Sequence, residues 1–155
     1  MATVHNLCSL LLNASRASHA AVAVPYSRTN VSVCFVLHRA GLVASVVGGD
    51  RLAPFAAGRE VPVTPQNVAA RRLWVGLKYR DGAAVLSKCA VVSKGSRRVV
   101  ATAAELRAVA AGRNSSLLKA RSVGTITVVR TAYGIIELQT ALEHRVGGEV
   151  LCVCA

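Results

Sequence analysis

The stretch that decides the fold reads TITVVRTAYGII over residues 125–136 and, ten residues later, GGEVLCVCA over residues 147–155. The first part is a β-branched run that meets a turn containing Gly134, and an apolar pair follows the turn. The residues between the two parts have the length of a short helix. Because β-branched residues favour strands and glycine favours tight turns, we expect the order strand, turn, strand, helix, strand.

Three helices are predicted upstream of this unit. Apolar residues recur at helical spacing over residues 4–12 and again over residues 33–40, where Gly41 stands in the position of a helix C-cap. Thr102 and Glu105 have the spacing of a capping box, which predicts a helix that begins after Thr102.

Short apolar runs predict strands at residues 20–24, 42–47 and 73–77, and residues 79–82 predict a hairpin turn. Helices and strands do not alternate strictly, so a doubly wound parallel sheet is disfavoured and an α+β fold is predicted.

We expect two small mixed lobes. The N-terminal lobe, residues 1–92, has the order helix, strand, helix, strand, strand, and the C-terminal lobe, residues 93–155, is rich in β-structure. Residues 48–70 contain three prolines and three glycines and are predicted to form a loop insertion, with an edge strand near residues 61–64.

Composition points to a packed protein with a polyanionic partner. The chain has 155 residues, of which 53% are hydrophobic, and a net charge of +12. Arginine supplies most of this charge, and its planar guanidinium suits phosphates and the faces of bases. A basic surface without a specific site is the alternative interpretation.

No metal, cofactor or small-molecule substrate is expected. The five cysteines are scattered without a C-x-x-C pair, and we interpret them as reduced, buried apolar residues: Cys8, Cys34, Cys89, Cys152 and Cys154. The histidines are dispersed, so no catalytic group of residues stands out. The longest stretch without Asp, Glu, Lys or Arg, residues 1–15, is shorter than the ~18 to 20 residues of a membrane span.

The order of elements in residues 125–155 resembles the C-terminal domain of the universal small-subunit ribosomal protein number eight family. Residues 11–16 with 21–27 resemble the first helix, strand and Ser-rich turn of that family, and residues 33–42 resemble its second helix. The resemblance implies a structural, RNA-binding subunit that grips the central domain of the small-subunit ribosomal RNA beside neighbouring small-subunit proteins.

The stretch of residues 71–81 resembles the mitochondrial branch of this family in fungi, which implies a location in the mitochondrial matrix. The first 49 residues contain no acidic residue, which is compatible with import. Since the first helix also matches the fold, we expect it to be retained in the mature protein.

The resemblance places RNA contacts at two segments of the C-terminal lobe. The family's usual Ser-Thr-Ser turn is replaced here by an arginine, a threonine and an alanine, so a charged phosphate contact could replace a neutral one. The glycines are expected to let the backbone approach RNA, and a tight turn is the alternative. Two further arginines are expected to face phosphates as a second pair, and surface charge that faces only solvent is the alternative. The expected RNA-binding residues are Arg130, Thr131, Ala132, Tyr133, Gly134, Gly147, Gly148, Glu149, Arg16 and Arg28.

Three other functions remain open from the sequence. A bacterial or plastid ribosomal protein of the same family shares the terminal strand. A free RNA-binding regulator shares the basic charge. An RNA-modifying enzyme would use Cys89 or Cys154 as its nucleophile.

Overall fold

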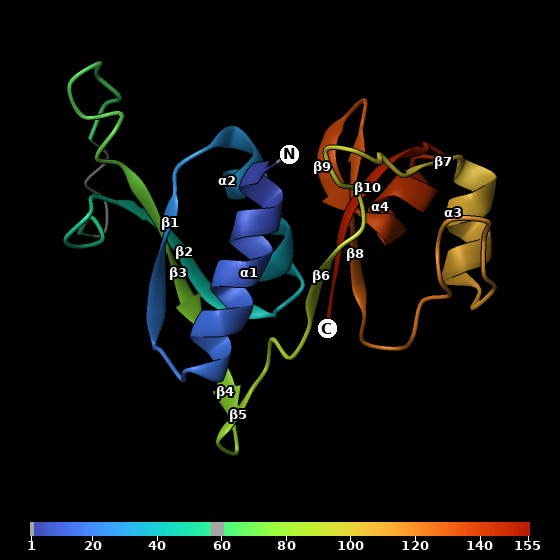
Figure 1. Ribbon diagram of the computed structural model, residues 1–155, viewed down its shortest axis with the longest axis horizontal. Helices are drawn as coiled ribbons and strands as arrows, with labels where there is room; N and C mark the ends of the chain where they lie inside the picture. Colours follow the sequence, from blue (N-terminus) through green and yellow to red (C-terminus); the bar gives the residue numbers. More distant parts are fainter. Residues whose placement is uncertain (1, 57–60) are drawn as a thin grey trace.

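The structure is a computed structural model that describes residues 2–56 and 61–155. Its N-terminal half is a three-stranded antiparallel sheet in the order β1-β3-β2, with two helices packed on it (Figure 1). The elements are α1 (Ala2–Arg16), β1 (Ala21–Pro25), α2 (Arg28–Arg39), β2 (Val43–Gly49) and β3 (Arg72–Leu77). None of the described helices is long and apolar enough to cross a membrane.

A small hairpin connects the two halves of the molecule. Its strands are β4 (Tyr79–Arg80) and β5 (Ala83–Ala84), which pair antiparallel. Asp81 and Gly82 between them have φ angles of 51° and 77°. Two central residues with positive φ match the twist of a two-residue hairpin, so the predicted turn is confirmed.

The C-terminal half is a sheet built around its last strand. Strand β10 pairs with β6 on one side and β8 on the other, β7 also pairs with β10, and β9 pairs with β8. The strand, turn, strand, helix, strand unit is therefore confirmed. The elements are β6 (Cys89–Val91), β7 (Val100–Ala101), α3 (Ala103–Ala110), β8 (Ile126–Thr131), β9 (Gly134–Glu137), α4 (Leu138–Glu143) and β10 (Gly148–Cys154).

Two hydrophobic clusters hold these elements together, and the larger one joins both halves. It packs Leu11 of α1 and Val75 of β3 with Leu151 of β10. The smaller cluster lies under α3 and α4 and includes Leu106 and Leu138. The α+β class is confirmed. The division of the chain between residues 92 and 93 stays a prediction, and β6, which precedes that boundary, forms part of the C-terminal sheet.

The predicted edge strand at residues 61–64 is wrong. These residues form no strand, and Asn67 closes a turn there by accepting from the Thr64 amide and donating to the Pro62 carbonyl, both at 2.9 Å. Pro62 and Pro65 have no N–H to donate, which removes ladder bonds from this stretch. Gly48 and Gly49, assigned to the insertion, instead continue β2 and pair with β3.

The predicted capping box at the start of α3 is present and makes stability depend on pH. The Glu105 amide donates to Thr102 Oγ1, and the Thr102 amide donates to Glu105 Oε2 at 2.7 Å. The backbone hydrogen bond from Thr102, followed by the one from its hydroxyl, lowers the pKa of Glu105 from 4.5.

Thr102→Ala is expected to lower the free energy of unfolding by about 1 kcal/mol at neutral pH, because it removes the N-cap. Since the pKa of Glu105 is depressed in the fold, its stabilisation is present above 4.5 and is lost as pH falls through the folded pKa. Urea unfolding of both proteins across this range checks the prediction. A difference between them that is the same at every pH would contradict the role of the Glu105 carboxylate.

Candidate RNA interface

The tip of the β8–β9 hairpin is a turn closed by Thr131 and Gly134. Thr131 Oγ1 donates to the Gly134 carbonyl at 3.1 Å and accepts from the Tyr133 amide at 3.2 Å. Gly134 has a φ of 112°, a conformation that disfavours any side chain. A hydroxyl has two acceptor lone pairs, so Thr131 keeps one for a partner outside the turn.

Tyr133 projects from this tip and is 70% exposed. Its ring centroid lies 5.4 Å from that of His144, which caps α4, and the two planes are tilted by 34°. Sequence reasoning did not assign His144 to the site, because its separation from Tyr133 carries no signal. An exposed, supported aromatic ring is a surface on which an unpaired base can stack.

Arg130 is held at the base of the turn by a buried carboxylate. Glu149 of β10 lies opposite Arg130 of β8 in the sheet, and Glu149 Oε2 is 3.5 Å from Arg130 Nη1. The other nitrogen, Nη2, donates to Thr29 Oγ1 of α2 at 3.5 Å. Glu149 is only 8% exposed and its Oε1 has no hydrogen-bond partner among the described residues. In this arrangement Glu149 positions Arg130.

Gly147 and Gly148 lie against the protein's own backbone. A Cβ atom on Gly147 would be 2.5 Å from the Ala101 carbonyl oxygen, and one on Gly148 would overlap the Arg130 carbonyl oxygen. This close approach of backbone to backbone accounts for the absence of side chains at both positions, without any contact with RNA. Contact of these two glycines with RNA stays a prediction.

The structure separates the two arginines expected to form a second pair. Arg28 is exposed at the first position of α2, next to the Thr29 that Arg130 contacts. Arg16 ends α1 on the side of the β4–β5 hairpin, where Tyr79 Oη donates to the His19 carbonyl at 2.6 Å. That end of the molecule lies opposite the β8–β9 turn (Figure 1). Arg28 thus belongs with the turn and Arg16 does not.

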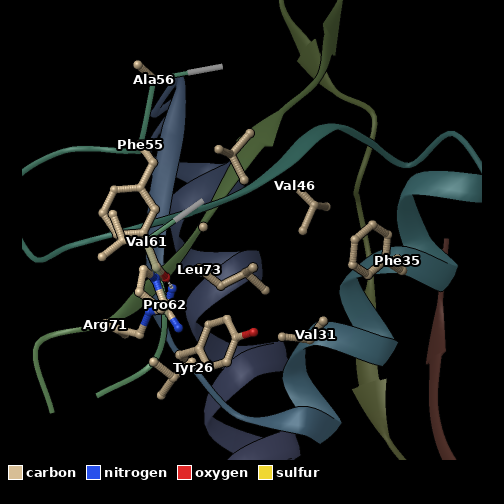
Figure 2. Close-up of a pocket in the computed structure, with 13 residues that line it drawn as sticks. Tyr26, Val31, Phe35, Val46, Phe55, Ala56, Val61, Pro62, Arg71 and Leu73 are labelled. Carbon is tan, nitrogen blue, oxygen red and sulfur yellow. Dashed lines mark hydrogen bonds between the residues drawn. The ribbon is translucent and has the colours of Figure 1, made fainter. Parts of the chain in front are cut away.

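The N-terminal half carries a groove of about 710 Å³ with mostly apolar walls. Figure 2 shows Arg71 on this groove with the rings of Tyr26 and Phe55 near it. The Arg71 guanidinium is 5.4 Å from the Tyr26 ring and 5.9 Å from the Phe55 ring, and it donates to the Val61 carbonyl at 2.5 Å. Arg71 therefore ties the insertion to the start of β3.

Among residues 2–56 and 61–155, no group of three or more His, Cys, Asp or Glu side chains is placed to hold a metal ion. The features that stand out are a basic chain, two α+β halves and an exposed hairpin tip with an aromatic ring and an arginine. Together they define a class of small α+β proteins whose surface suits a polyanion.

The chain belongs to the ribosomal protein S8 family, whose profile matches residues 2–154. It is 39% identical to small ribosomal subunit protein uS8m of Neurospora crassa over 96% of this chain and 95% of that one. It is 37% identical to uS8m of Schizosaccharomyces pombe, over 96% and 97% of the two chains. A bacterial uS8, from Gluconacetobacter diazotrophicus, is 31% identical over 95% and 92%.

These comparisons confirm the predicted family and its fungal, mitochondrial branch. They also confirm that the chain is a structural protein, which sets aside the RNA-modifying enzyme with Cys89 or Cys154 as nucleophile.

Proposed function

We propose that the protein is a structural constituent of the mitochondrial small ribosomal subunit that binds the central domain of the small-subunit RNA through the β8–β9 turn. Family membership makes it a component of the small ribosomal subunit, and the relatives named uS8m place it in the mitochondrion. We place its work in the matrix. The main support for RNA binding at this turn is the exposed ring of Tyr133 next to Arg130, whose guanidinium is held by Glu149.

The turn has the chemistry that an RNA helix and its loops require. A-form RNA presents 2′-hydroxyls and phosphates across a shallow groove, and its unpaired bases stack on aromatic rings. Ala132 and Gly134 leave the backbone open to close approach, and Thr131 offers an acceptor. Arg130 is 40% exposed, so its outer N–H groups can reach a phosphate. Arg28 adds a second positive charge on the same side of the molecule.

Neighbouring small-subunit proteins are the other proposed partners. Among the described residues of the insertion, residues 48–70, the side chains of Val63 and Val68 are exposed. Exposed apolar residues in a loop are characteristic of protein contacts. We propose that this segment is ordered further by its neighbours in the particle.

Tyr133→Ala is expected to weaken binding to the RNA central domain roughly tenfold, because one stacked base contributes about 1 to 3 kcal/mol. The full-length chain and a transcript of that domain from the same mitochondria are titrated at several salt concentrations. Tyr26→Ala, which removes a tyrosine that is 45% exposed on the N-terminal half, is the matched control and should bind as the wild type does.

Equal affinities of the folded Tyr133 and Tyr26 variants would remove the turn from the interface. Each phosphate contact should steepen the slope of log affinity against log salt by about 0.7 to 0.9. An affinity that does not change with salt would contradict phosphate contacts altogether.

The matrix location and the retained first helix have their own tests. The protein should resist protease in mitoplasts and sediment with the mitochondrial small-subunit RNA, whereas recovery with cytosolic or plastid ribosomes would overturn the assignment.

Leu7 and Leu11 of α1 are buried in the larger hydrophobic cluster, which supports retention of this helix. Mass spectrometry of a mature N-terminus beyond Arg16 would contradict it.

A further inference from the structure

All five cysteines lie in the hydrophobic cluster that joins the two halves, and four of them contact one another through their sulfur atoms although they are spread along the sequence. We call them the thiol cluster: Cys8 of α1, Cys89 of β6, and Cys152 and Cys154 of β10. Cys152 and Cys154 lie on one face of their strand because they are two residues apart. The Sγ atoms of Cys89 and Cys154 are 3.2 Å apart. Nothing in the proposed ribosomal role uses these thiols.

The backbone holds Cys89 and Cys154 in the geometry of a cross-strand pair. They are direct partners in the antiparallel ladder of β6 and β10. Lys88 and Ala155, the adjacent pair, exchange both backbone hydrogen bonds, at 2.8 and 2.9 Å. Cys89 and Cys154 are therefore a non-hydrogen-bonded pair, in which Cα atoms are about 4.5 Å apart. That separation falls within the ~4.4 to 6.8 Å range of disulfides.

We propose that Cys89 and Cys154 form a redox-active pair that hydrogen peroxide oxidises to a cross-strand disulfide. The Cys89 sulfur attacks a peroxide oxygen, which gives a sulfenic acid and releases one water. The Cys154 sulfur then attacks the Cys89 sulfur, the S–S bond forms, and the second water leaves. The two thiols lose two protons and two electrons in total, and one peroxide is reduced to two waters.

Exposure supports Cys89, rather than Cys154, as the first thiol of the pair to react. Cys89 is 9% exposed, whereas Cys154 is fully buried. Hydrogen bonds from Cys152 and then Cys89 lower the pKa of Cys8 from 9.0 to about 4. A hydrogen bond with Cys154 lowers the pKa of Cys89, but the bond to Cys8 and burial outweigh it and raise the value. A sulfur with so low a pKa is a poor proton acceptor, so the proton that Cys89 loses passes to the hydroxide that leaves the peroxide, which departs as water.

The disulfide would fix β10, the strand that also carries Glu149 opposite Arg130. It would close the long loop between β6 and β10 in the unfolded chain, so it should raise the melting temperature. A thiol reductant should reverse both the bond and the rise.

In the test, the reduced, full-length chain is treated with hydrogen peroxide and then denatured. The thiols that remain are blocked with an alkylating reagent, and the number of blocked thiols is counted. The count should fall by two, from five to three. Peptide mapping should find Cys89 joined to Cys154, and dithiothreitol should restore all five thiols. Cys89→Ala should keep its four thiols, whereas Cys154→Ala should fall from four to three, because Cys89 stops at the sulfenic acid. Cys34→Ala, another buried cysteine on α2, is the matched control and should fall from four to two.

Mapping of the wild-type chain decides the proposal even where a variant fails to fold. Five thiols that survive peroxide, or a bond that joins Cys8 to Cys152 instead, would overturn the assigned pair. Zinc that co-purifies in a one-to-one ratio and protects the thiols would also overturn it, in favour of a metal site.

Discussion

Gly148→Ala is expected to lower the free energy of unfolding by about 3 kcal/mol, near the upper end of the cost of overpacking. Its Cβ would overlap the Arg130 carbonyl oxygen of the neighbouring strand. The obstructing atom belongs to the backbone, so no rotation of a side chain relieves the overlap. A loss of this size corresponds to a melting temperature roughly 10 °C lower, which circular dichroism measures directly.

Gly48→Ala is the matched control, because Gly48 is also a strand glycine. A Cβ at this position would lie 3.7 Å from the Phe55 ring, an ordinary contact. Its free energy of unfolding should stay within about 0.5 kcal/mol of the wild type. If both variants melt at the wild-type temperature, the close approach of β10 to β8 does not constrain residue 148.

Arg130→Met is expected to cost about 2 kcal/mol of stability, because it leaves the Glu149 carboxylate buried without a cation. Removing one partner of a fully buried ion pair costs roughly 3 to 5 kcal/mol. The expected value is smaller because Arg130 itself is 40% exposed and its charge is partly screened. Adding Glu149→Gln should restore part of the loss, and a double-mutant cycle by urea unfolding measures the coupling.

Arg80→Met provides the control for charge and side-chain length. Arg80 also contacts a carboxylate, Asp81, at 3.8 Å, but the two side chains are 87% and 94% exposed. Such a surface pair contributes about 0 to 1 kcal/mol, so this variant should unfold almost as the wild type does. Equal losses for the two arginine variants would mean that Glu149 does not depend on Arg130.

Features encoded by neighbouring residues were predictable from the sequence. The capping box of Thr102 and Glu105 and the turn at Asp81 and Gly82 depend on residue types at fixed short spacings. The terminal unit also follows from local signals, because Gly134 marks its first turn and Gly147 stands directly before its last strand. The edge strand at residues 61–64 failed because prolines remove backbone donors from a stretch that is otherwise rich in β-branched residues.

Contacts between distant segments were not predictable in the same way. Arg130 meets Glu149, and Cys89 meets Cys154, only because β10 adopts one particular register with β8 and β6. A shift of one residue would turn every side chain of β10 to the other face. The Tyr133–His144 contact also depends on how α4 returns over the hairpin, which no spacing in the sequence specifies.

The central place of β10 sets the order in which the molecule can be completed. β10 follows β6, β7 and β8 in the chain, and it pairs with all three. During synthesis, which proceeds from the N-terminus, all three strands of the sheet β1, β2 and β3 are present once Leu77 has been added. Strands β6, β7 and β8 lack their shared partner until β10, which begins at Gly148, has been made. Until then their unpaired edges can pair with strands of other molecules. A nascent chain therefore becomes competent for assembly in a single late step, in which the β8–β9 turn becomes rigid as the last strand enters.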